Sequence, residues 1–150
     1  MPFLRGRFLR RLEELPGPDG LTRTERQILF CLNAESGLTS VALFGAVQKM
    51  EDTEFMGDWS FWRVLDELAL GNAPLVAGLD GAPFQVEDKV RMETYVKSQP
   101  ALTNLGKQVV TGQTDLAEHR PIDRWWGGTH LTNAKLWRWD PETEHLIAPI

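Results

Sequence analysis

Cysteine is almost absent from this chain of 150 residues, which contains only Cys31. A lone cysteine cannot form an internal disulfide, and it cannot supply the several thiolates of a cysteine-based zinc site. Long apolar runs are missing as well, since no stretch approaches the roughly 20 residues that a membrane-spanning helix requires. Four arginines interrupt the apolar residues of the first eleven positions, so no signal peptide is expected there. These absences predict a protein of a reducing compartment, expected in the cytoplasm and without a membrane partner.

Recognisable catalytic sequence is also lacking. The chain has no Gly-x-Ser-x-Gly elbow, no phosphate-binding loop and no dinucleotide-binding glycine pattern. The three histidines, His119, His130 and His145, are scattered and do not have the spacing of metal ligands. We therefore predict no catalytic residue, no metal site and no cofactor, and the sequence indicates no small-molecule ligand.

One polar cluster keeps an enzymatic hypothesis open. Asp123, Arg124 and His130 lie close in sequence, and a carboxylate can orient an imidazole for proton transfer. Nothing completes such a site, because Cys31 falls inside a predicted core helix and no serine elbow is present. The alternative is structural, with His130 as a hydrogen-bond donor and Asp123 and Arg124 as a pair or cap. An enzyme with a site at these residues ranks behind two binding hypotheses.

Basic residues are fewer than acidic residues in this chain. Lysine and arginine number 16 against 21 aspartates and glutamates, which gives a net charge of −5. Binding to duplex DNA requires a basic surface, because neutralisation of phosphates supplies most of the non-specific affinity. The position of each charge therefore matters more than the total.

Apolar residues at helical spacing predict a leading helix over residues 1–15. Leu4, Phe8, Leu12 and Leu15 recur every three or four positions. The proline- and glycine-rich residues 16–21 end this helix and are expected to form a linker. The leading helix either packs on the following domain or belongs to a coiled or inter-domain element.

The segment 22–112 begins with three predicted helices, near residues 22–35, 39–50 and 58–70. Thr22 and Glu25 have the spacing of a capping box at the first of them. Apolar stripes on the three helices are expected to be buried together: Ile28, Leu29, Leu32, Phe44, Val47, Phe61, Leu65 and Leu68. Three short helices with short connections are typical of a helix-turn-helix-like bundle.

After Pro74 the period changes, and residues 75–97 are expected to form a β-hairpin. Val90 to Val96 alternate apolar and polar side chains, which is typical of a strand with one polar face. The following residues, Ala101–Val110, resemble the segment that leaves the wing of many bacterial winged-helix proteins. The resemblance implies that Leu102-Thr103 closes the last wing strand, that Thr103 caps a helix and that Gly106 follows. We therefore expect an α+β fold, with a winged-helix-like three-helix bundle and a β-hairpin wing over 22–112.

A second resemblance covers nearly all of the chain from about Arg10 onward. The segments Leu21–Leu29, Phe55–Trp62 and Ile122–Leu131 resemble the C-terminal region of an uncharacterised bacterial family of unknown function. This resemblance implies no activity, but it suggests that similar modules often follow another domain.

Residues 113–150 are expected to extend the same domain. Gln113–Pro121 is predicted as a polar loop, and Gly127-Gly128 as a turn with positive φ beside bulky tryptophans. Alternation from Leu136 to Asp140, a proline-led turn and the return at His145–Ile147 predict a C-terminal β-hairpin.

The charge of the third bundle helix decides between the binding hypotheses. Residues 51–70 carry six carboxylates against Arg63 alone, a balance of −5, which is unsuited to a helix that reads DNA bases. The leading hypothesis is a non-catalytic module for protein–protein interaction or self-association, because Trp and Arg dominate interface hot spots. Its candidate surface is Trp59, Trp62, Arg63 and Trp126, and the alternative for each tryptophan is a place in the core.

The second hypothesis is a DNA-binding transcriptional regulator that uses an atypical basic face. Its candidate contacts lie on the leading helix and on the predicted wing strand: Arg5, Lys89, Arg91 and Lys97. Protein or self-association ranks above nucleic acid as the partner.

Overall fold

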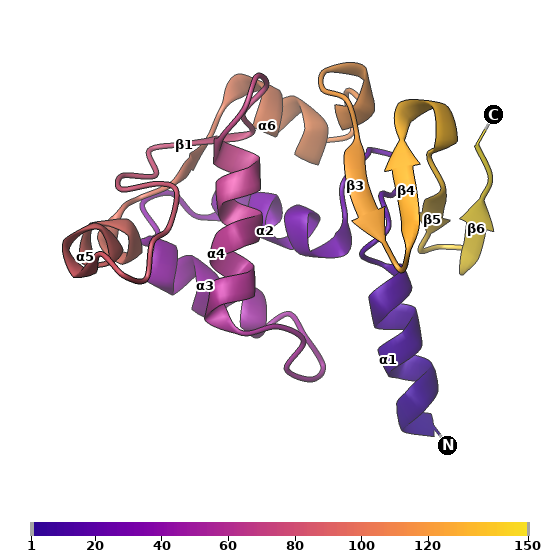
Figure 1. Ribbon diagram of the computed structural model, residues 1–150, viewed down its shortest axis with the longest axis horizontal. Coiled ribbons are helices and arrows are strands. Elements are labelled where there is room, and N and C mark those ends of the chain that lie inside the picture. Colours follow the sequence, from indigo (N-terminus) through magenta and orange to yellow (C-terminus); the bar gives the residue numbers. More distant parts are fainter. Residues whose placement is uncertain (1, 150) are drawn as a thin grey trace. The chain divides into compact units, whose positions relative to one another are not determined.

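The computed structural model describes residues 2–149 and shows an α+β protein. In this part of the chain, six α-helices accompany three small antiparallel two-stranded sheets (Figure 1). The residues cluster into two compact units. Unit 1 combines Met1–Thr24 with Gly112–Ile150, and unit 2 is the continuous segment Glu25–Thr111. Both ends of the chain thus belong to the same unit.

Unit 2 begins with the three predicted helices. They are α2 (Arg23–Ala34), whose first residues precede the unit boundary, α3 (Ser40–Gln48) and α4 (Asp58–Ala69). Thr39 caps α3 by accepting from the amide of Ala42, whereas Gly57 occupies the N-cap position of α4 and supplies no side-chain acceptor. The expected apolar stripes are buried, except that Phe44 is half-buried against Phe61.

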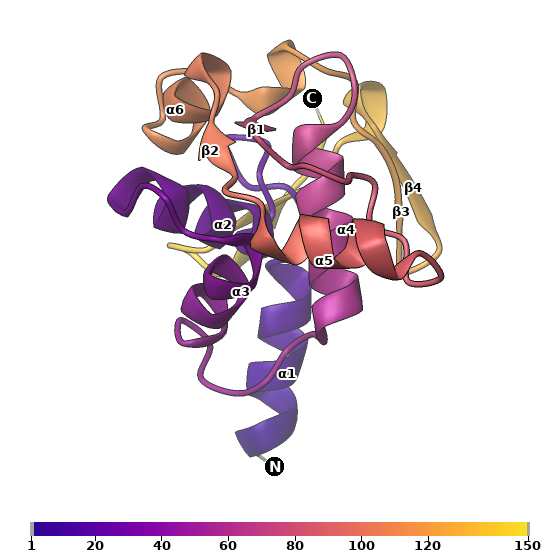
Figure 2. The ribbon, with the colours of Figure 1, turned by 90° about the vertical axis from the view of Figure 1, so that its left-hand side faces the viewer.

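The predicted wing strand is wrong. Residues 89–97 form helix α5 (Lys89–Lys97), which Asp88 caps by accepting from the amide of Arg91. Tyr95, which the alternation placed on the polar face, is the fully buried residue of this helix. Because a short run fits both periods, the aspartate cap and the packing of Tyr95 outweigh the strand pattern. Figure 2 shows α5 beside α3 and α4.

A short antiparallel pair of strands precedes the last helix of unit 2. Strand β1 (Val76–Ala77) pairs with β2 (Ala101–Leu102), and α6 (Asn104–Val110) follows. Thr103 caps α6, as the sequence resemblance implied, by accepting from the amide of Gly106. A Cβ atom on Gly106 would collide with the carbonyl oxygen of Leu75, so this position requires glycine.

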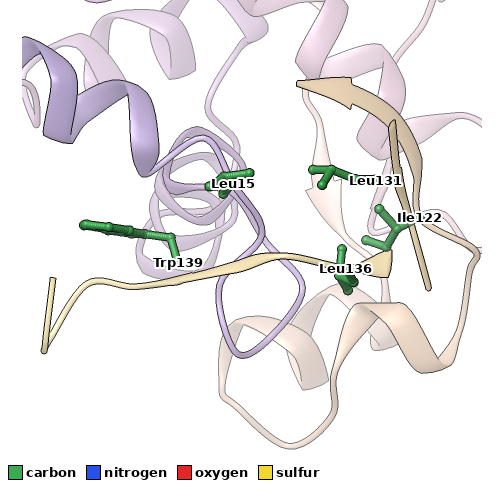
Figure 3. Packing of buried hydrophobic residues seen from close by; sticks show 5 residues of the cluster. All are labelled: Leu15, Ile122, Leu131, Leu136 and Trp139. Carbon is green, nitrogen blue, oxygen red and sulfur yellow. The ribbon is translucent and has the colours of Figure 1, made fainter. Parts of the chain in front are cut away.

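Unit 1 joins the two chain ends around a small hydrophobic cluster. Helix α1 (Pro2–Leu12) packs Leu9 and Leu12 against it. Figure 3 shows the five buried members of this cluster: Leu15, Ile122, Leu131, Leu136 and Trp139. Residues 9–12 of the predicted leading helix therefore pack within unit 1, whereas its outer apolar residues do not.

The segment expected to be a linker is fixed by hydrogen bonds to the C-terminal part of unit 1. Arg138 donates to the carbonyl oxygen of Gly17 at 2.7 Å, and the amide of Trp139 donates to Pro16 at 3.0 Å. Arg138 also lies 2.5 Å from a carboxylate oxygen of Asp115. Arg138 thus connects the C-terminal part of unit 1 with Gly17, which lies more than a hundred positions earlier in the chain.

Two β-hairpins complete unit 1. Strands β5 (Arg138–Asp140) and β6 (His145–Ile147) form the predicted C-terminal hairpin. A further hairpin of β3 (Asp123–Trp126) and β4 (Thr129–Thr132) was not predicted, although its Gly127-Gly128 turn has the expected positive φ at both residues. Short 3-10 turns, η1 (Leu116–Glu118) and η2 (Asn133–Lys135), precede β3 and β5.

Candidate functional site

An aromatic cluster fills the space between α4, α5 and the loop before α5. Trp62 lies at its centre and is only 3% exposed. Four rings surround it at centroid distances of 5.3 to 5.9 Å: Phe44, Phe61, Phe84 and Tyr95. The interpretation of Trp62 as a surface residue is therefore wrong, because the loop that carries Phe84 covers it.

A partly buried polar network connects this loop with α4. The Tyr95 hydroxyl donates toward the carbonyl oxygen of Trp62, at 3.1 Å, and a carboxylate oxygen of Asp66, at 3.0 Å. The other Asp66 oxygen accepts from the amide of Phe84 at 2.9 Å. Burial raises the pKa of Asp66 although both hydrogen bonds oppose the rise. Burial and the neighbouring Asp66 charge also raise the pKa of Tyr95.

A shallow groove opens on the outer side of this network. It has a volume of about 300 Å³. Its lining residues come from one face of α4 and from the loop before α5: Trp59, Arg63, Asp66, Phe84, Gln85, Val86 and Glu87. Trp59 is 58% exposed, and its ring meets Phe84 edge-on at a centroid distance of 6.5 Å. Two aromatic rings, one firmly packed and one mostly free, thus form the apolar part of the groove.

Carboxylates dominate the charge around this groove. Arg63 is exposed and reaches Glu67 of the next turn at 3.4 Å. Asp66 and Glu87 line the groove on either side, so acidic groups outnumber the single arginine. Outside the groove lining, the loop that leads into α4 carries Glu51, Asp52 and Glu54, and α4 begins with Asp58. Aromatic faces beside carboxylates are suited to a cationic ligand with an apolar part.

The fourth predicted interaction residue, Trp126, is not among the residues that line the groove. Trp126 belongs to unit 1, where its half-buried ring packs against the hydrophobic cluster. Strand alternation turns Trp126 toward this cluster and its neighbour outward. The exposed ring of this strand is Trp125, at 72%.

The predicted DNA contacts do not form a basic wing. Lys89, Arg91 and Lys97 lie on helix α5, and the Arg91 guanidinium donates to backbone carbonyls of residues 81–83, with Ala82 at 3.0 Å. Arg91 therefore stabilises a turn of unit 2. Arg5 lies in unit 1, where it pairs with Glu144 at 3.2 Å. The candidate contacts are thus split between two units, and one of them has a structural role.

The structure does bring Asp123 and His130 together. Their side chains meet at 2.6 Å across the β3–β4 hairpin, and the His130 ring stacks on Trp125 at 4.9 Å with an interplanar angle of 9°. Arg124 points to the opposite face of the strand and pairs in register with Leu131. The carboxylate and imidazole are both exposed to solvent, and this arrangement supports a surface pair that orients His130 on the hairpin.

Cys31 is placed inside the core of unit 2. Its sulfur contacts the sulfur of Met50 at 3.6 Å, and burial together with the nearby Glu35 raises the pKa of the thiol. A thiol of this kind is a poor nucleophile. Among residues 2–149, no group of three or more histidine, cysteine or acidic side chains is arranged to hold a metal ion.

The sequence identified Trp59 and Arg63 of the groove but missed Phe84, Asp66 and Glu87. Phe84 lies in residues 82–88, which fit neither the helical nor the strand period. The spacing of Trp59, Arg63 and Asp66 was a usable signal, because positions i, i+4 and i+7 share one helix face.

No protein-family model, curated protein or solved structure matches this chain. In the described residues, no helix combines the length and apolar character that crossing a membrane requires.

Proposed function

We propose that this protein is a non-catalytic binding module whose groove on α4 docks a cationic, apolar-bearing segment of a protein chain. The observation that carries this proposal is Trp59, a large ring left mostly exposed beside Phe84 and within reach of carboxylates. Tryptophan anchors of this kind contribute disproportionately to binding at protein interfaces.

The rigidity of the groove supports the proposal. Its floor is held by the two hydrogen bonds to Asp66, so the loop with Phe84 is ordered before any ligand arrives. A preformed site loses less conformational entropy on binding than a flexible one. The acidic surroundings favour lysine or arginine side chains and disfavour the phosphates of nucleic acid.

We further propose that unit 2 is a divergent winged-helix-like core. The order of α2, α3, α4, β1, β2 and α6 supports this, as does Thr103 at the start of α6. Helix α5 occupies the place between the two short strands where a wing hairpin is expected.

A fluorescence anisotropy titration tests the proposed function. The probe is a labelled peptide of alternating arginine and phenylalanine residues, and the matched probe has glutamate in place of arginine. We expect saturable binding of the basic probe only, weakened at least tenfold in the Trp59→Ala variant, as for an interface hot spot. Trp125→Ala is the control, because it removes a tryptophan of unit 1 that is even more exposed than Trp59.

Two results would contradict the proposal. Equal affinity of wild type and Trp59→Ala for the basic probe would remove the groove as the site. Saturable binding of a labelled DNA duplex at physiological salt, weakening as salt rises, would favour the regulator hypothesis instead.

A further inference from the structure

The apolar residues of helix α1 are buried only toward its C-terminal end. Leu9 and Leu12 pack against the hydrophobic cluster of unit 1. Leu4 and Phe8 lie nearer the N-terminus, where they are 50% and 67% exposed. These two residues do not contribute to the core of unit 1. Figure 1 shows α1 extending away from the two hairpins of that unit, with its N-terminal end outermost.

Arginines accompany the exposed apolar pair. Leu4, Arg7, Phe8 and Arg11 occupy positions i, i+3, i+4 and i+7, so they form one continuous strip, called here the α1 stripe. Arg7 and Arg11 are both exposed. Helix α1 contains no acidic residue, although the whole chain carries a net charge of −5. Such a basic aromatic stripe is complementary in charge to an acidic surface that carries aromatic rings.

The groove of unit 2 has that opposite character. It offers Trp59 and Phe84 to an incoming ring, and it offers Asp66 and Glu87 to incoming arginines. Its volume of about 300 Å³ is sufficient for one large side chain, since a cavity of roughly 150 Å³ already holds a benzene ring. A single phenylalanine with flanking arginines, the pattern of the α1 stripe, fits these requirements.

We infer that the α1 stripe of one copy docks in the α4 groove of a second copy, with Phe8 as the anchor. This inference rests on the proposed function and identifies the segment that the groove binds. Phe8 enters beside Trp59, and Arg7 and Arg11 face the carboxylates. The contact area of one helix face is small, so the association is weak and reversible.

The geometry of this contact is heterologous, because a stripe on one copy meets a different surface on the next. Such contacts either close into a ring, of which two copies are the smallest, or propagate into longer assemblies. Each copy therefore has one donor surface and one acceptor surface. If every copy lacks the α1 stripe, or every copy lacks the α4 groove, association is abolished. If one copy lacks only the stripe and another lacks only the groove, the remaining groove and stripe still form one contact between them.

Sedimentation velocity of the full chain from low micromolar to submillimolar concentration tests the inference. The wild type is expected to exceed the monomer mass as concentration rises. Phe8→Glu removes the stripe, Trp59→Ala removes the groove, and each variant alone is expected to stay monomeric. An equimolar mixture of the two variants is expected to form a dimer and nothing larger. Leu146→Glu is the control, since it places the same charge at another exposed apolar site of unit 1.

The side chains of Phe8 and Trp59 are mostly exposed. Circular dichroism with thermal unfolding verifies that each variant keeps its fold. A wild type that stays monomeric at every concentration overturns the inference, as does a mixture that stays monomeric while the wild type associates. Phe8-dependent binding of a monomeric chain to vesicles of phosphatidylserine and phosphatidylcholine also overturns it, and assigns the stripe to lipid.

The peptide titration distinguishes the two failures. If only the self-association is wrong, the basic probe still needs Trp59 although the chain does not associate. If the proposed function is wrong, the probe binds wild type and Trp59→Ala equally or does not bind at all.

Discussion

The two units of this chain achieve order by different means. Unit 2 is continuous in sequence, and its capped helices pack around fully buried residues such as Leu65 and Tyr95. Unit 1 brings together segments from both chain ends and depends on contacts such as that of Arg138 with Gly17 and Asp115. Among the described residues, its hydrophobic cluster has five buried members, and Leu21 and Leu116 are buried as well. The comparison shows that local sequence and apolar packing account for unit 2, whereas polar contacts between distant segments define unit 1.

The largest expected effect is the loss of stability when a buried leucine is removed from the core of unit 2 rather than of unit 1. Leu65→Ala in unit 2 should lower the free energy of unfolding by about 2–5 kcal/mol, because it opens a cavity between helices. Leu131→Ala in unit 1, at an equally buried position, should cost only about 2 kcal/mol, since a small cluster beside loops can collapse. Urea unfolding measures both values. An equal or larger cost at Leu131 would break the comparison.

The next effect tests the polar part of unit 1. Arg138→Ala should cost about 2–3 kcal/mol, because it removes charge-assisted hydrogen bonds to Gly17 and Asp115 and leaves Asp115 partly buried. The matched change Arg63→Ala breaks an exposed pair with Glu67 on α4 and should cost about 0.3–0.5 kcal/mol. Hydrogen exchange should locate the destabilisation of Arg138→Ala in residues 16–21. Costs of the same size for the two arginines would contradict the account of unit 1.

A smaller effect concerns the start of α6 in unit 2. Thr103→Ala should cost about 1 kcal/mol, because the amide of Gly106 loses its side-chain acceptor. Thr103→Ser keeps the hydroxyl and should remain close to wild type. Thermal unfolding of the two variants gives the comparison. If serine is as destabilising as alanine, the cap is not the reason for the effect.

The smallest effect is a pH dependence in the β5–β6 hairpin. Hydrogen bonds from Thr143 and from the amide of Glu142 lower the pKa of Asp140. A lowered folded-state pKa stabilises the hairpin above the ordinary aspartate pKa, and this stabilisation disappears as pH falls through the lowered value. Amide chemical shifts of residues 142–143 followed through an acid titration should show this transition. The Asp140→Asn variant should not show it.

The sequence predicted the helices of unit 2 well because their signals are local. A capping threonine and an apolar stripe identify α3 without any tertiary contact. It failed at α5, where alternation from Val90 to Val96 predicted a strand. The burial of Tyr95 against Trp62 decided the structure of that segment. A distant contact of this kind leaves no periodic mark in the sequence.

Only some of the residues of the candidate site were predicted from the sequence. Trp59 and Arg63 were identified from charge and residue type, but the same reasoning included Trp62, which Phe84 covers. The loop that carries Phe84 has no regular period, so its contact with α4 could not be anticipated. In unit 1, the Gly127-Gly128 turn was recognised, yet the hairpin around it was not, although two glycines between β-prone residues are a hairpin signal.

Hydrogen exchange of the full chain, with and without saturating basic peptide, tests the central claim most directly, because it locates a bound ligand without altering the protein. The α4 groove is in unit 2, and the exposed Trp125 and His130 of unit 1 provide an internal comparison. We predict slower exchange in residues 58–67 and 83–88 and no change in residues 123–132. Protection confined to unit 1, or unchanged exchange in both units at saturation, would contradict the assignment of the groove as the binding site.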